Sequence, residues 1–306
     1  MDSKHEIAYS QAAIQNEIAD LEHRLAAAKA RLRTPPSEVS NKPQPSLQCN
    51  ASPTRLPRAE ASSRRTAPLD SPAHYLLLLS DSQLPIGSFA FSSGLESYVA
   101  HNRRATFSSF LPLSLSSYAA TTLPFVLAAH RDPSSLIELD DQLDAAVVCT
   151  VGRRASVSQG RALLSIWERS FRGTLPGNAD LPVLREYSAL LKNGNGGSAG
   201  EVPPVSAHLP PLFGVVCAVV GLTLQQTAYV YMVGHLKALV SAAVRASMFG
   251  PYQAQKVLAG EQAQRLIVDV IEREWETRVE VAGQSVPVMD LWIGRHEVLY
   301  SRIFNS

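Results

Sequence analysis

Two apolar stretches limit most strongly what this chain can fold into. Residues 212–222 are too few to cross a bilayer as a helix. Residues 228–249 include His235, Lys237 and Arg245, which are costly in hydrocarbon. Helices that are apolar on most of their faces must then be covered by other parts of the protein. We therefore expect a helical bundle with these two stretches at its centre.

Helical periodicity and capping residues predict more helices around that centre. Ser92 or Ser93 would cap a helix that has Glu96 in its first turn, and Ser134 or Ser135 would cap another. Two glycine- and proline-containing stretches, residues 173–209 and 277–286, are expected to be loops. The expected helical segments are residues 73–80, 92–100, 106–130, 134–172, 211–223, 227–249, 251–276 and 287–303. The predicted fold class is all-α.

The first 72 residues differ from the rest of the chain. In residues 1–33, apolar side chains recur at two heptad positions and predict an amphipathic, coiled-coil-like helix. This helix either packs on its own domain or pairs with a partner, and both possibilities stay open. Residues 34–72 are rich in Pro, Ser and Arg and are expected to form a disordered linker. The third part, residues 73–306, is predicted to be the all-α domain.

Charge and cysteine content narrow the class of protein. The 28 basic and 27 acidic residues give a net charge of +1, which favours neither nucleic acid nor an anionic membrane as partner. Cys49, Cys149 and Cys217 are odd in number and far apart, which argues against a disulfide framework. The first residues resemble neither a signal peptide nor a mitochondrial presequence. We expect a cytoplasmic protein.

The residues that could carry chemistry are scattered. No Cys-x-x-Cys motif is present, and the eight histidines show no metal-ligand spacing. The glycine-rich run at 194–200 lacks the Lys-Ser or Lys-Thr of a phosphate loop. His130 is expected to cap a helix C-terminus, and His235 to be a hydrogen-bonded core or interface histidine. We therefore expect no cofactor, no metal site of its own and no enzymatic activity.

One acidic motif suggests an alternative function. Asp140, Asp141 and Asp144 have the D-D-x-x-D spacing with which all-α isoprenoid enzymes hold magnesium against a diphosphate. No second acidic cluster of the usual kind accompanies it, so we expect a solvated acidic helix face. A coiled-coil adaptor that uses residues 1–33 is the other alternative.

Two further segments are unusual for a plain helical domain. Residues 80–96, here called the hallmark segment, place Pro85 and Gly87 in an irregular stretch between two helices. Residues 296–306, here called the tail, carry Tyr300, Ile303 and Phe304 where chain ends are usually polar and frayed. An ordered apolar tail must be buried by something, because ordering its backbone costs free energy. It either binds a partner or folds back on its own core.

At these segments the chain resembles the urease accessory protein F family. The similarity runs in the same order through LLLLSDSQLPIGSFAFSSGLESYV (76–99), SQGRALLSIW (158–167), HLPPLFGVVCAVVG (208–221), LKALVSAAVRASMFGPYQAQKVL (236–258) and HEVLYSRIFNS (296–306). The last of these matches a terminal H-E-x-x-x-x-R-x-F-x-S signature. Residues 1–72 have no counterpart, which a eukaryotic, fungal-type member would explain.

The resemblance implies an all-α, homodimeric scaffold without an active site. Such proteins join a D- or H-type accessory protein and recruit or regulate a nickel-carrying GTPase, so that nickel enters apo-urease. The residues that match the N-terminal hallmark, with scaffold roles, are Pro85, Gly87, Phe89, Ser92, Gly94 and Glu96. The tail residues expected to bind a partner are His296, Glu297, Tyr300, Arg302, Ile303, Phe304 and Ser306.

Overall fold

The computed structural model describes residues 71–81, 84, 86–175, 182–194 and 204–305. The predicted N-terminal helix (1–33) lies outside this range, as do almost all of the predicted linker, Pro85 and Ser306. Within the described residues the secondary structure is helical, with no strand, so the all-α prediction is confirmed.

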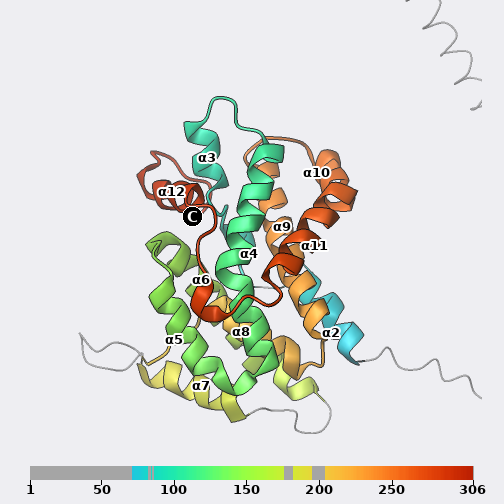
Figure 1. Ribbon diagram of the computed structural model, residues 1–306, viewed down its shortest axis with the longest axis vertical. Coiled ribbons are helices and arrows are strands. Elements are labelled where there is room, and N and C mark those ends of the chain that lie inside the picture. The colour runs from blue at the N-terminus through green and yellow to red at the C-terminus, as the bar shows by residue number, and fades with distance from the viewer. Residues whose placement is uncertain (1–70, 82–83, 85, 176–181, 195–203, 306) are drawn as a thin grey trace, which may run out of the picture. The chain divides into compact units, whose positions relative to one another are not determined.

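Eleven α-helices make up the described part of the chain, joined by turns and short 3₁₀ segments (Figure 1). They are α2 (Ser71–Ser80), α3 (Leu95–His101), α4 (Phe107–Arg131), α5 (Leu136–Ala146), α6 (Thr150–Ile166), α7 (Pro182–Gly194), α8 (Leu209–Val219), α9 (Leu224–Arg245), α10 (Pro251–Ala259), α11 (Glu261–Glu274) and α12 (Val288–Gly294).

Helix α8 is the centre of the bundle. Every residue of α8 from Leu209 to Cys217 is buried. α4 and α6 make the most extensive contacts with it, and α5 and α9 add further ones. α4 and α9 are long and apolar enough to span a membrane by length and composition alone, yet 67% of the apolar stretch of each is buried inside the bundle. The predicted central stretches therefore lie at the centre, as core helices.

Two glycines allow backbones to meet at this centre. A β-carbon on Gly214 of α8 would lie 2.3 Å from the carbonyl oxygen of Val126 in α4. A β-carbon on Gly160 of α6 would lie 2.1 Å from the carbonyl oxygen of Ala207, just before α8 begins. Any other residue would force these elements apart, because real β-carbons do not approach oxygen atoms so closely.

Helix α4 continues through both of its prolines, although Pro112 and Pro124 predict kinks or breaks. Pro124 has no N–H to donate to the carbonyl of Ala120 one turn earlier. The N–H of Gly283 donates to that carbonyl instead, at 3.2 Å. The free carbonyl thus anchors the segment that leads into α12. Thr106 caps α4 by accepting from the N–H of Ser109.

Three expectations about the elements were wrong. The predicted loop 173–209 contains α7, which buries Leu184 and Tyr187 against the core. The segment 251–276 is two helices, because the chain turns at Gly260. The predicted helix 287–303 ends near Val298, and Leu299 is extended. This last difference arises because backbone N–H groups beyond it donate to a distant side chain, described below.

Substitution of the glycine at the α4–α8 contact tests the packing of the centre. We expect Gly214→Ala to destabilise the protein by roughly 1–3 kcal/mol, because α8 must move away from α4. Gly234 is also a helical glycine, but an added β-carbon there has no neighbour within 4 Å. Gly234→Ala should therefore be neutral or stabilise by up to about 1 kcal/mol. Urea unfolding of both variants measures the difference, and equal effects would contradict a close crossing at Gly214.

Candidate functional site

The hallmark segment turns sharply at two glycines. Gly87 has φ +79° and Gly94 has φ +85°. A glycine at 87 allows either a positive φ or the close approach of another helix, and the structure shows the positive φ. An added β-carbon on Gly94 would lie 3.1 Å from the backbone nitrogen of Ile293 and 3.1 Å from the β-carbon of Trp292. Gly94 therefore brings the start of α3 directly against α12.

The first turn of α3 starts later than the sequence suggests. Gly94, rather than Ser92 or Ser93, is the residue before the helix, and α3 begins at Leu95. Ser92 is completely buried, and its hydroxyl accepts from the N–H of Glu96 at 3.4 Å. Ser93 has φ +49°, which prepares the turn into Gly94. The consequence is that the side chain of Glu96 faces the tail.

The carboxylate of Glu96 holds the tail. It accepts hydrogen bonds from the N–H of Ile303 at 2.6 Å, from the N–H of Phe304 at 3.3 Å and from His296 Nε2 at 3.0 Å. The N–H of Asn305 donates to the carbonyl of Ala90 at 2.8 Å. The two segments that sequence analysis singled out, 207 residues apart at Glu96 and Ile303, therefore form one site. We call these contacts between residues 86–96 and 296–305 the tail latch.

Charged side chains on α6 and α9 add to the latch. Arg154 of α6 pairs with Glu297, which also accepts from Arg302 at 3.2 Å. These ion pairs are largely exposed, so they contribute little to the stability of the tail's position. Arg245, the last residue of α9, lies with its guanidinium 4.2 Å from the ring centroid of Phe304. Its Nη2 also donates to the carbonyl of Phe89.

The tail residues divide into buried and exposed ones. His296 is fully buried and Phe304 is only 4% exposed, so Phe304 folds back on its own core. Tyr300 is fully exposed and Ile303 is 62% exposed. Phe89 of the hallmark segment is 55% exposed as well. The structure thus corrects the expectation that the Phe304 side chain is free for a partner, and leaves Tyr300 and Ile303 free.

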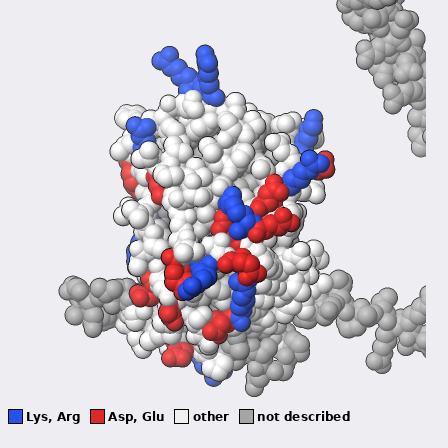
Figure 2. Space-filling model, in the orientation of Figure 1, with Lys and Arg blue, Asp and Glu red and all other residues white. Residues whose placement is uncertain are grey.

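The surface beside the tail also carries exposed apolar side chains. Leu291 of α12 and Val298 are mostly exposed. The chain end lies beside α12 in Figure 1. Figure 2 shows a broad uncharged area over the upper part of α4, with charged side chains around it. Exposed apolar side chains within a polar surround are a suitable contact for another protein.

The acidic motif is occupied by the protein itself. Asp140 is 1% exposed, and its carboxylate accepts the backbone N–H groups of Ser206, Ala207 and His208 at 2.7, 3.2 and 2.7 Å. The expected solvated acidic face is therefore wrong for Asp140, and holds only for the exposed Asp141. A buried carboxylate needs such donors.

Asp144 is also bound by protein groups. Burial would raise the pKa of Asp144, but hydrogen bonds from Arg153 and His208 outweigh it and lower the pKa to about 2. Arg153 binds both carboxylate oxygens, and His208 Nε2 lies 2.8 Å from Oδ1. Asp140 and Asp144 are therefore unavailable to a magnesium–diphosphate complex. Across the described residues, no three His, Cys, Asp or Glu side chains come together as a set that could hold a metal ion.

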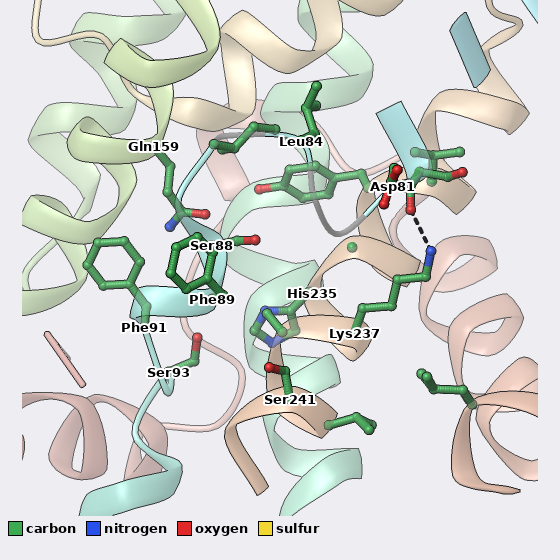
Figure 3. Close-up of a pocket in the computed structure, with 18 of the residues that line it drawn as sticks. Asp81, Leu84, Ser88, Phe89, Phe91, Ser93, Gln159, His235, Lys237 and Ser241 are labelled. Atoms are coloured by element: carbon green, nitrogen blue, oxygen red, sulfur yellow. Dashed lines mark hydrogen bonds between the residues drawn. The ribbon is translucent and has the colours of Figure 1, made fainter. Parts of the chain in front are cut away.

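A cavity of about 570 Å³ lies behind the hallmark segment, between it and α9. Figure 3 shows Phe91 and Ser93 on one wall and Lys237 on the opposite one, with His235 between them. His235 is buried, stacks on Tyr118 with ring centroids 3.8 Å apart, and has its Nε2 3.0 Å from Ser114 Oγ. The prediction of a hydrogen-bonded core histidine is confirmed. His130 Nε2 binds the carbonyl of Leu222 at 2.8 Å, a contact with another element rather than a cap of its own helix.

Sequence analysis missed Arg154 and Arg245. In the sequence, Arg154 lies with Arg153 and Arg161 in a basic stripe typical of a solvated helix face, and Arg245 follows the common pattern of a basic residue in a last helical turn. The contact partners of both are tail residues far along the chain. No local pattern could indicate those contacts.

Comparison with known proteins identifies similar chains. A sequence model of the family described as UreF matches residues 101–262. A fission yeast (Schizosaccharomyces pombe) protein named uncharacterized urease accessory protein UreF-like is 37% identical over 236 residues, covering 76% of this chain and 97% of the relative. Urease accessory protein F of rice (Oryza sativa subsp. indica) is 32% identical, covering 74% and 82%. Urease accessory protein UreF of an Arthrobacter strain is 29% identical, covering 74% and 94%.

A pair of glycine substitutions tests the contact between the hallmark segment and α12. We expect both Gly87→Ala and Gly94→Ala to cost about 1–2 kcal/mol, because an L-residue is strained at positive φ. Gly94→Ala should lower the free energy of unfolding by more than Gly87→Ala does. Only at Gly94 does the added β-carbon meet another element, whereas at Gly87 it finds open space. Chemical unfolding measures both. Equal costs would mean that α12 does not lie against Gly94.

The buried histidine predicts a specific loss of stability in acid. Burial lowers the pKa of His235 from 6.5 to about 3. Between these values the unfolded chain binds a proton that the folded protein does not, so stability falls as the pH falls through this window. Between pH 7 and pH 5 the free energy of unfolding should fall by about 2 kcal/mol from this histidine alone. His235→Gln should lose less stability over that range than the unsubstituted protein. His74 is exposed, so His74→Gln is the control, and its loss of stability between pH 7 and pH 5 should equal that of the unsubstituted protein.

Proposed function

The chain belongs to the UreF family, and on that premise we propose that it is a urease accessory protein that acts in urease maturation by binding other proteins. The names of its fungal, plant and bacterial relatives support this role. Contact rather than catalysis is favoured because the best enzyme candidate, the acidic motif, has Asp140 and Asp144 bound by the protein's own donors.

We propose that the latched tail is the surface that binds the D- or H-type accessory protein. One observation carries this proposal: Tyr300 and Ile303 are exposed although Glu96 fixes the backbone beside them. Binding to a surface that is already ordered avoids the entropy cost of ordering a free chain end. Exposed aromatic and aliphatic side chains on a fixed backbone are the kind of anchor that dominates binding energy at protein interfaces.

The remaining steps follow from the family premise. A cytoplasmic homodimer of this chain would join the D- or H-type protein, and the complex would recruit or regulate the nickel-carrying GTPase at apo-urease. Nickel is the cargo of that assembly and not a cofactor of this chain. A coiled-coil adaptor role for residues 1–33 is a separate proposal, because that segment lies outside the described residues.

Substitutions on the exposed side of the tail test this proposal. We expect Tyr300→Ala and Ile303→Ala each to weaken binding of the purified D- or H-type accessory protein about tenfold, because truncating an interface anchor costs more than about 1 kcal/mol. The melting temperature should stay unchanged, since neither side chain is buried. Titration calorimetry measures the affinity. Tyr252 on α10 is 92% exposed and away from the latch, so Tyr252→Ala is the matched control.

Two results would contradict the proposal. One is a double Tyr300→Ala, Ile303→Ala variant that binds as tightly as the unsubstituted protein. The other is a well-folded, unsubstituted protein that does not bind the D- or H-type protein at all.

A further inference from the structure

Arg245 contacts both a backbone carbonyl of the hallmark segment and an aromatic ring of the tail. Its guanidinium lies 4.2 Å from the ring centroid of Phe304, and its Nη2 donates to the carbonyl of Phe89. Phe89 belongs to the short 3₁₀ helix Ser88–Ala90, whose last carbonyl accepts from Asn305. The side chain therefore joins three elements: α9, the hallmark segment and the tail.

The charge of Arg245 fits this position. Burial lowers the pKa of Arg245, and the nearby charge of Glu96 opposes that effect. The carboxylate that holds the tail backbone thus also favours the cation that covers the tail ring. Glu96 fixes the backbone of Ile303 and Phe304, but a backbone hydrogen bond alone leaves the side chains free to rotate. Burial against the core and contact with the Arg245 guanidinium together restrict the Phe304 ring.

We infer that Arg245 is a positioning residue for the partner-binding tail, which it holds in one geometry against the hallmark segment. This inference rests on the proposed function of the tail. With Phe304 buried under the guanidinium, the side chain of its neighbour Ile303 stays 62% exposed on the outside of the latch. Arg245 itself need not touch the partner.

The inference requires an arginine at this position. A guanidinium is planar, so it can stack on a ring and donate from its edge at the same time. A lysine at 245 would keep the positive charge at the end of α9 but could make only one of the two contacts. If the residue served only the helix dipole of α9, lysine would replace it without loss. The Arg245→Lys variant therefore separates the two roles.

Limited proteolysis measures the latch without any partner. Trypsin cleaves after Arg302, but the N–H of the next residue, Ile303, donates to Glu96 at 2.6 Å, so the latch must open before cleavage. We expect Arg245→Ala and Arg245→Lys to release residues 303–306 roughly fivefold faster than the unsubstituted protein, as followed by intact mass. Arg265, exposed on α11 and paired only with Glu261, gives the matched control Arg265→Ala, which should cleave at the original rate.

Binding of the D- or H-type protein gives the second measurement. Arg245→Ala and Arg245→Lys should weaken it about tenfold while helicity and melting temperature stay unchanged, because the anchors are intact but no longer fixed. Arg245→Ala should weaken binding less in a Phe304→Ala background than alone, since the ring contact is already lost there. The inference would be overturned if both Arg245 variants were cleaved at the rate of the unsubstituted protein. It would also be overturned if Arg245→Lys matched the unsubstituted protein in both cleavage and binding.

The two proposals fail in different ways. Faster cleavage of the Arg245 variants together with no binding by the unsubstituted protein would sink the proposed function and leave the positioning of the tail standing. Unchanged cleavage together with normal binding would sink the inference alone.

Discussion

The bundle depends on two places where backbones touch. At Gly214 and Gly160 the chain has no side chain, so α8 can lie directly on α4 and begin directly against α6. This closeness lets a helix as short as α8 be buried along most of its length. α4 and α6 cover most of its surface, and α5 and α9 add further contacts. A larger residue at either glycine would move α8 away from α4 or from α6.

The same chemical device fastens two returning segments to this frame. Asp140 accepts the N–H groups of residues 206–208, and Glu96 accepts those of residues 303 and 304. In each case a carboxylate on a helix satisfies backbone donors that no helix or strand would satisfy. Segments held this way can follow irregular paths, which explains why residues 204–208 and 299–305 are ordered without regular structure. Loss of either carboxylate would leave several donors unpaired at once.

Much of this fold is readable from the sequence, and the limits have a physical cause. Apolar stretches predicted the central helices, because that signal is local. Gly87 indicated an irregular stretch for the same reason. The burial of Asp140 and the course of the tail could not be predicted. A carboxylate that binds distant backbone N–H groups has the same local sequence pattern as an exposed acidic residue. The hallmark segment and the tail were each recognised, but nothing local says that Glu96 joins them.

The latch also fixes when the exposed face of the tail can form. Its first half follows α2 and its second half is almost the last described segment to be made during translation, so every helix from α4 to α12 is synthesised between them. Contacts over such a separation form late, after the local elements have folded. A chain that is still on the ribosome can thus have all of its core helices and still lack the exposed face formed by Tyr300 and Ile303.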